Sequence, residues 1–112
     1  KHFEVLRNFR MKKPTMEIDV VGKRLDVTML IDCKHWKRMS YSNLKIIVGK
    51  QIKRAEQYIQ DKKNMIVVPI IVTLYKEETS FVNGTPIVPI FQFSSFIDEF
   101  YGNLEYMNTI KK

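Results

Sequence analysis

Residues 16–34, MEIDVVGKRLDVTMLIDCK, decide the fold, because two β-rich runs in this stretch are joined by a short polar turn. The runs cover residues 16–22 and 27–34 and are rich in branched aliphatic residues, which favour extended backbone. So short a connection favours antiparallel pairing of the two strands. Residues 3–10 alternate roughly between apolar and polar, so we expect a third strand that completes a meander.

After this meander the period of the apolar residues changes. From Ser42, the expected N-cap, they recur at three- and four-residue steps, which predicts an amphipathic helix over residues 43–60. Residues 65–75 are almost continuously apolar and predict a strand covered on both faces. Pro69 lies within this run and cannot donate a hydrogen bond, so a bulge or an irregular stretch is expected there.

The apolar residues that define the stripe of the predicted helix over residues 43–60 are Leu44, Ile47, Val48, Ile52, Ala55 and Ile59.

The C-terminal part adds one strand and one helix. Residues 86–93 predict a further strand, and a short helix is expected to begin at Ser95, with Asp98 as its capping partner. The resulting order is β-β-β-α-β-β-α. We therefore predict an α/β fold, with a mixed sheet flanked by helices, in a single domain spanning residues 1–112.

Composition restricts the functional classes. The single cysteine, Cys33, excludes an intramolecular disulfide, and one cysteine with two histidines is too few for the usual zinc cluster. A reducing, cytoplasmic setting is the natural expectation. No apolar run reaches the roughly 20 residues that span a bilayer, so no membrane partner is expected.

The net charge of +7 is unevenly distributed. Residues 1–63 contain sixteen Lys and Arg against seven Asp and Glu, whereas residues 64–112 contain three against five. The basic half is the expected surface for a polyanion, of which nucleic acid is the commonest. A lysine-rich solvated surface is the alternative explanation.

Charged residues interrupt the apolar strand sequences on one face. Residues two apart in a strand point the same way, so Glu17 shares a face with Asp19, and Asp32 shares one with Lys34. If the two strands pair, two carboxylates and an ammonium group converge. Carboxylates that close together are costly to bury unless a cation lies between them. The alternative is an exposed face of paired salt bridges.

The segments EIDVV (residues 17–21) and DCKHW (residues 32–36) resemble the PD-(D/E)xK superfamily of restriction-endonuclease-like nucleases. The similarity is greatest to Mrr-type restriction enzymes and archaeal Holliday-junction resolvases, and extends in outline over residues 3–75. The order β-β-β-α-β also matches the family core. In two respects the chain departs from the family. It begins at the first strand, as expected of a fragment that lacks the family's N-terminal core helix, and no proline precedes Asp19.

The resemblance implies a metal-dependent nuclease that hydrolyses DNA phosphodiester bonds. Asp19, Asp32 and a carbonyl from Cys33 would bind Mg²⁺ or Mn²⁺, and Lys34 would orient or deprotonate the attacking water. Gln51 on the following helix, together with Glu17 on the second strand, is a second-rank site candidate. Gln51 can also be explained as a residue at the edge of the core. Cys33 itself is expected to be a small core residue rather than a nucleophile.

Several cationic residues are expected to lie off the apolar stripe of the helix, face outward and touch DNA phosphates: Lys45, Lys50, Lys53 and Arg54. Simple solvation explains each one alone. Trp36 either stacks on a base or packs in the protein. Two other classes stay open: a non-catalytic nucleic-acid-binding module, and a protein-interaction or assembly domain that uses a strand edge at residues 86–93. Protein partners would be a second copy or other domains of a parent chain.

Overall fold

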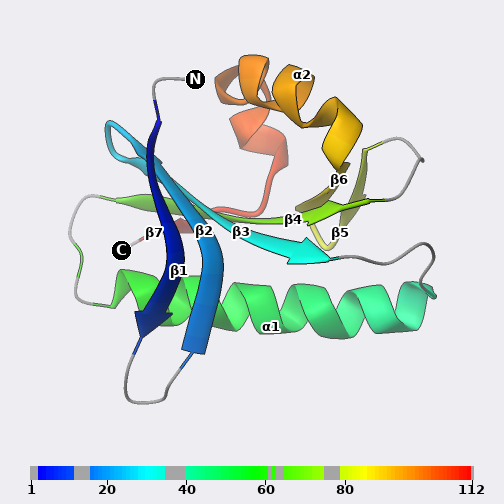
Figure 1. Ribbon diagram of the computed structural model, residues 1–112, viewed down its shortest axis with the longest axis horizontal. Helices are drawn as coiled ribbons and strands as arrows, with labels where there is room; N and C mark the ends of the chain where they lie inside the picture. The colour runs from blue at the N-terminus through cyan, green and yellow to red at the C-terminus, as the bar shows by residue number, and fades with distance from the viewer. Residues whose placement is uncertain are drawn as a thin grey trace.

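The computed structural model describes residues 3–11, 16–34, 40–60, 62, 65–74 and 79–111. The seven strands in this part of the chain join one mixed sheet, with α-helices and 3-10 helices packed on it (Figure 1). The elements in chain order are β1 Glu4–Met11, β2 Met16–Arg24, β3 Val27–Lys34, α1 Tyr41–Ile59, β4 Ile66–Thr73, β5 Ser80–Val82, β6 Thr85–Pro89, η1 Ile90–Gln92, α2 Phe93–Asp98, η2 Tyr101–Tyr106 and β7 Ile110–Lys111.

The strand order in the sheet is β1-β2-β3-β4-β6-β5, and β7 pairs with one end of β4. The strands β1, β2 and β3 form the predicted antiparallel meander. The helix α1 then crosses over so that β4 lies parallel to β3, and β6 in turn lies parallel to β4. The class of mixed α/β fold is therefore confirmed.

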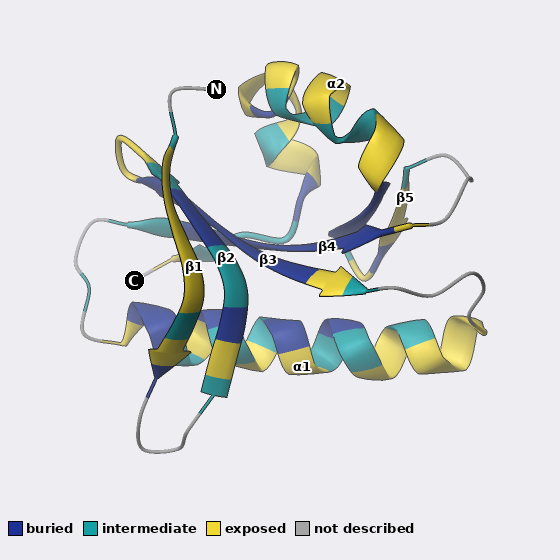
Figure 2. Cartoon of the chain, in the orientation of Figure 1, coloured by how far each residue is buried: buried dark blue, intermediate teal, exposed yellow. Residues whose placement is uncertain are grey.

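The sheet is the middle layer of three, with α1 on one face and α2 with η2 on the other (Figure 1). The predicted apolar stripe of α1 packs against the sheet; Val48 lies in a cluster with Ile71, and Ala55 lies in one with Leu30. On the other face, Phe100 packs among the buried residues of β3 and β4. Figure 2 shows β3 and β4 buried along almost all their length. These two central strands fix the position of Asp32 and Lys34 at the end of β3.

Pro69 does not disturb β4, so the predicted irregularity there is wrong. The strand runs through Pro69 in register with Leu30 of β3. On its other edge β4 pairs with β7 at Ile66 and Val67 and with β6 only from Ile71 onward. Pro69 falls between these two ladders, where no strand needs its missing N–H.

Three expected boundaries are also wrong. The N-cap of α1 is Ser40, whose side chain accepts the N–H of Asn43 at 3.2 Å, and not Ser42. The strand expected over residues 86–93 ends at Pro89, because the chain curls into η1 immediately afterwards. That turn leads directly into α2, which begins at Phe93 rather than Ser95 and has no side-chain cap.

The position of β6 changes one functional alternative. It lies between β4 and β5, so residues 86–89 are not the sheet edge that an assembly domain would use. The two short strands β5 and β7 were not expected from the sequence; they have three and two residues, too few for a visible alternation. Within the described ranges, none of the helices combines the length and apolar character needed to cross a membrane.

Candidate active site

The site lies where the β2–β3 ladder ends. The last paired residues are Val20 and Ile31, so the next position in register would place Asp19 opposite Asp32. The neighbouring β1–β2 ladder skips the position of Asn8, which has a positive φ of 52°. At this break the Asp19 carboxylate turns to β3, where its Oδ2 accepts the backbone N–H of Cys33 at 2.9 Å.

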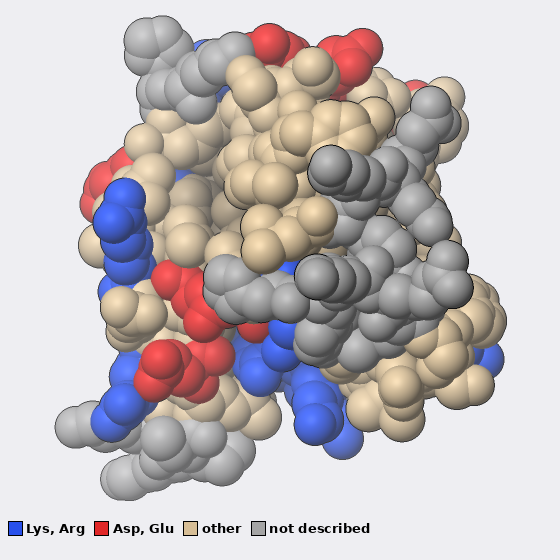
Figure 3. Space-filling view, turned by 45° about the vertical axis from the view of Figure 1, so that its right-hand side comes forward, with Lys and Arg blue, Asp and Glu red and all other residues tan. Residues whose placement is uncertain are grey.

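Asp32 is the buried acid of the site, with 7% of its surface exposed. Its Oδ2 lies 3.1 Å from the Nζ of Lys34 and 3.9 Å from the Nη1 of Arg54. Apart from these ion pairs, that buried oxygen accepts no well-aligned hydrogen bond from the described residues. Figure 3 shows acidic and basic side chains gathered next to each other on one face of the molecule.

The surroundings of Asp32 raise its pKa above the usual 3.8. Desolvation is the largest cause, and the neighbouring Asp19 carboxyl raises the pKa further; Lys34 and Arg54 act in the opposite direction. The site thus brings two acids together, an arrangement that a cation between them stabilises.

This pKa leads to a prediction about stability. The folded state holds the Asp32 proton more tightly than the unfolded state, so without metal the stability should fall as the pH rises from about 3.8 through the folded-state pKa. Above that pKa the full cost of the buried charge is present. We therefore expect Asp32→Asn to raise the melting temperature at pH 7 in EDTA, and the gain to shrink toward pH 4. A gain that is equally large at both pH values would contradict this explanation.

Gln51 is placed by α1 under the sheet and is fully buried. Its Nε2 donates to the carbonyl of Leu30 at 2.7 Å and to that of Ile70 at 3.4 Å. Its Oε1 accepts from Arg54 at 3.0 Å. Gln51 is therefore neither at the edge of the core nor in direct contact with the two acids. Its hydrogen bonds connect α1 to β3 and β4 and position the Arg54 guanidinium, which faces Asp32.

Gln51→Ala should destabilise the fold by about 2–3 kcal/mol, because it removes a buried donor and leaves the Arg54 guanidinium without its acceptor. Equilibrium urea unfolding measures this change. Gln60→Ala is the matched control, since Gln60 is exposed at the end of α1 and should change stability by less than about 0.5 kcal/mol. Equal effects of the two substitutions would contradict the role given to Gln51.

Two other predicted site residues, Glu17 and Cys33, have exposed side chains. Glu17 is exposed and forms an ion pair with Arg10 at 3.0 Å on the neighbouring strand β1. Cys33 is exposed, so its expected place in the core is wrong: β3 leaves the covered part of the sheet at this residue. Partial burial and the charges of Asp19 and Asp32 raise the pKa of its thiol, which makes it a poor nucleophile at neutral pH.

The predicted nucleic-acid residues separate into two groups. Lys45, Lys50 and Lys53 are exposed on α1, as expected. Arg54 is not an outward-facing residue: only 23% of its side chain is exposed, and its guanidinium turns to Gln51 and Asp32. The sequence pattern placed Arg54 off the apolar stripe. It did not reveal that the buried amide of Gln51, one turn earlier, accepts a hydrogen bond from Arg54. Trp36 lies outside the described residues.

The arrangement fits a hard divalent cation, since two carboxylates and a nearby strand backbone supply oxygen ligands of the kind that Mg²⁺ and Mn²⁺ bind. Because the N–H and C=O of one residue in a strand point the same way, we expect the carbonyl of Cys33 to face Asp19 as its N–H does. Within the described residues, no group of three or more His, Cys, Asp or Glu side chains forms a candidate metal site.

Comparisons with protein-family models, with curated proteins and with solved structures gave no match for this chain. Its function is therefore inferred from the geometry of the site.

Proposed function

We propose that the protein is a metal-dependent nuclease that hydrolyses DNA phosphodiester bonds. Its active site would consist of Asp19, Asp32 and Lys34. The observation that carries this proposal is the convergence of two carboxyl groups where the β2–β3 ladder ends. Asp19 accepts the backbone N–H of Cys33, and Asp32, the next position in register, is buried beside the ammonium of Lys34. The alternative from the sequence is an exposed face of paired salt bridges. Such a face does not explain why Asp19 lies next to the buried Asp32. A shared cation accounts for that pairing.

The topology also supports a restriction-endonuclease-like arrangement. In the resemblance drawn from the sequence, the first acid and the D-x-K group stand on adjacent strands of a hairpin that a helix joins to the next strand. Here Asp19 is on β2, Asp32 and Lys34 are on β3, and α1 leads to β4 parallel to β3. We propose this finer fold class on that agreement.

Each residue has a chemical role in this proposal. Asp19, Asp32 and the carbonyl of Cys33 would hold Mg²⁺ or Mn²⁺. The bound ion would stabilise negative charge on the scissile phosphate and acidify a water ligand. Lys34 would orient or deprotonate the attacking water and neutralise phosphate charge. Arg54 lies 3.9 Å from Asp32 and balances the charge of that carboxylate.

A cleavage assay tests the proposal on duplex, single-stranded and four-way-junction DNA, each with Mg²⁺, with Mn²⁺ and with EDTA. We expect products with 5′ or 3′ phosphate ends from at least one substrate, and only when metal is present. Metal-independent cleavage would contradict the proposed site. DNA binding without cleavage under any of these conditions would favour the non-catalytic nucleic-acid-binding module.

The exposed lysines of α1 provide a separate prediction about binding. Lys50 lies one helical turn before Arg54, so the lysine face of α1 borders the site. Reversing the charge at Lys45, Lys50 and Lys53 should weaken DNA affinity. It should also reduce the slope of log K against log salt concentration by up to about 0.9 for each phosphate that the variant no longer neutralises. Fluorescence anisotropy over a salt series measures both quantities.

Arg7, Lys23 and Lys111 allow a control with the same total charge change on β1, β2 and β7. Reversing these three should change affinity less than reversing the α1 lysines. If the two triple variants show equally weakened affinity, net charge rather than the α1 surface determines binding.

A further inference from the structure

Two threonines of the sheet have a buried hydroxyl that forms no hydrogen bond with the described residues. They are Thr73, the last residue of β4, and Thr85, the first residue of β6. Thr73 is 1% exposed and Thr85 is fully buried. A buried hydroxyl without a partner destabilises a fold, so each of these two groups needs an explanation.

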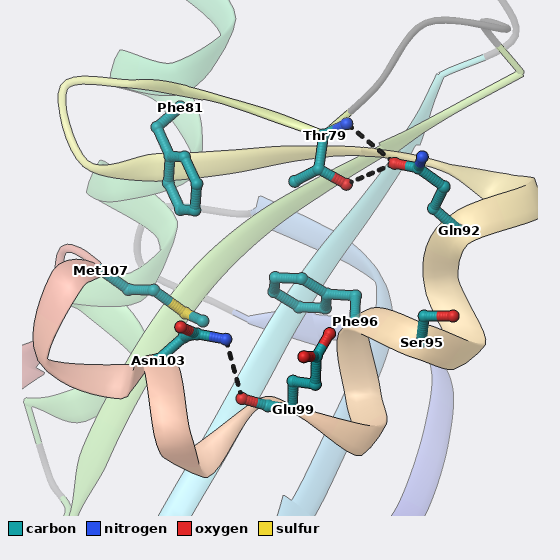
Figure 4. A pocket seen from close by; sticks show the side chains of 8 residues that line it. All are labelled: Thr79, Phe81, Gln92, Ser95, Phe96, Glu99, Asn103 and Met107. Atoms are coloured by element: carbon teal, nitrogen blue, oxygen red, sulfur yellow. Dashed lines mark hydrogen bonds between the residues drawn. The ribbon is translucent and has the colours of Figure 1, made fainter.

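The opposite layer of the sheet shows how a threonine hydroxyl is ordinarily satisfied. In the cavity between β5 and the α2–η2 segment, the Oε1 of Gln92 accepts both the N–H and the hydroxyl of Thr79, each at 2.8 Å (Figure 4). The hydroxyl of Thr73 has no such acceptor or donor in the described part of the chain. Its surroundings in the sheet therefore matter.

Thr73 lies beside Lys34. The parallel β3–β4 ladder pairs Lys34 with Thr73, and two residues earlier it pairs Asp32 with Ile71. Residues in register on neighbouring strands point to the same face of a sheet, and the strands are about 4.8 Å apart. Ile71 lies in a buried cluster with Val48 of α1. Thr73 and Lys34 therefore lie on the face of the sheet that α1 covers, next to the proposed active site.

The ammonium of Lys34 needs an acceptor other than Asp32 if Asp32 binds a cation. Its Nζ lies 3.1 Å from the Oδ2 of Asp32, and 27% of the Lys34 side chain is exposed. A divalent cation on the same carboxylate would repel the ammonium and compete for that oxygen. A partly buried ammonium that leaves a carboxylate needs another oxygen to accept its N–H groups. The hydroxyl of Thr73 is a side-chain oxygen directly across the ladder, within reach of the flexible lysine side chain.

We propose that Thr73 is a positioning residue of the nuclease site, whose hydroxyl accepts a hydrogen bond from the Lys34 ammonium when Asp32 binds the metal. This bond would hold the ammonium at the carboxyl ends of β3 and β4. Ligands of open α/β sheets bind beyond the carboxyl ends of parallel strands, and Lys34 and Thr73 are the last residues of these two strands. The inference rests on the proposed nuclease function, because it assigns Thr73 to the same site.

Two substitutions separate the hydroxyl of Thr73 from its shape. Thr73→Val removes the hydroxyl and should slow single-turnover DNA cleavage by about 10- to 100-fold, the range for one hydrogen bond to a charged group. The dissociation constant for DNA should stay unchanged. Thr73→Ser keeps the hydroxyl and should cleave at nearly the wild-type rate. Wild-type cleavage by Thr73→Val, or an equal loss in Thr73→Ser, would overturn the proposal.

Melting temperatures in EDTA distinguish this role from a structural one. Thr73→Val removes a buried hydroxyl without a partner, so it should melt above the wild type. Thr73→Ser removes a buried methyl group, so it should melt below the wild type. The more stable variant should thus be the less active one. If Thr73→Val lowers both the melting temperature and the cleavage rate, the hydroxyl supports the fold and the proposal is wrong.

Thr85→Val is the matched control. Thr85 has the same kind of buried hydroxyl, but it lies at the opposite end of β6 from Pro89, the residue that pairs with Thr73. This variant should also melt above the wild type, and it should cleave DNA at the wild-type rate. Equal slowing by Thr85→Val and Thr73→Val would contradict the position given to Thr73.

NMR of the Lys34 ammonium tests the same contact without DNA or cleavage. The nitrogen resonance of its Nζ is assigned by its absence from Lys34→Ala and is recorded with and without Mg²⁺. We expect Mg²⁺ to shift this signal in the wild type, and to broaden it in Thr73→Val through faster exchange with water. Identical Mg²⁺-bound signals in the two proteins would overturn the role of Thr73 and leave the nuclease proposal standing. A wild type that neither responds to Mg²⁺ nor cleaves DNA would contradict the nuclease proposal, and the role of Thr73 with it.

Discussion

Asp32→Asn should reduce DNA cleavage by about 10²- to 10⁴-fold at saturating Mg²⁺. The substitution keeps the size of the side chain and a group that can contact Lys34, but removes the negative charge that would bind the metal. Metal stabilisation of the scissile phosphate amounts to several kcal/mol, and each 1.36 kcal/mol changes the rate about tenfold. A single-turnover cleavage assay with protein in excess measures the rate of the chemical step.

The same substitution should not damage the fold. Because burial raises the pKa of Asp32, replacing this carboxyl with an amide should raise the melting temperature at pH 7 in EDTA. DNA affinity should persist as well, since the substitution removes a negative charge near the phosphates. Asp26→Asn is the matched control: Asp26 is exposed at the β2–β3 turn, at the other end of β3, and cleavage should stay at the wild-type rate. Wild-type cleavage by Asp32→Asn would contradict the site.

Lys34→Ala should also lower turnover by about 10²- to 10⁴-fold, the range for loss of a group that acts in proton transfer. The two acids remain, so Mn²⁺ binding should survive, in contrast to Asp32→Asn. The ammonium of Lys34 lies 3.1 Å from Asp32 and lowers its pKa, so metal binding to Lys34→Ala should require a higher pH than in the wild type. Calorimetric Mn²⁺ titrations at two pH values measure this shift.

Lys23→Ala is the control for that experiment, because it removes a lysine from β2 at the end remote from Asp19. Its turnover and Mn²⁺ affinity should match the wild type. If Lys34→Ala instead abolishes both turnover and metal binding, Lys34 organises the site rather than taking part in the reaction.

The meander and its hairpin could be predicted because local signals agree there. The β-rich runs, the short turn and the change of period at α1 each follow from a few neighbouring residues. They also suffice to predict that Asp19 and Asp32 come together. The irregularity expected at Pro69 is wrong because its tolerance depends on which strands pair on each side of β4, which is information from the whole sheet and not from the neighbouring sequence.

The roles of Gln51 and Arg54 depend on tertiary contacts that no local pattern reveals. Gln51 and Arg54 are three residues apart, so they lie on the same side of α1. Only the packing of α1 against β3 and β4 brings the Gln51 amide to the strand carbonyls. Arg54 then follows as the residue that this amide can hold. The short strands β5 and β7 have the same origin, since pairing with longer neighbours creates them.

The most direct measurement is a crystal structure of the protein grown with Mn²⁺, with anomalous diffraction recorded near the manganese absorption edge. We predict one anomalous peak between the carboxylates of Asp19 and Asp32, with the Cys33 carbonyl facing it, and no such peak in Asp32→Asn. A manganese ion bound elsewhere would contradict the central claim. So would crystals in which no ion lies between the two acids.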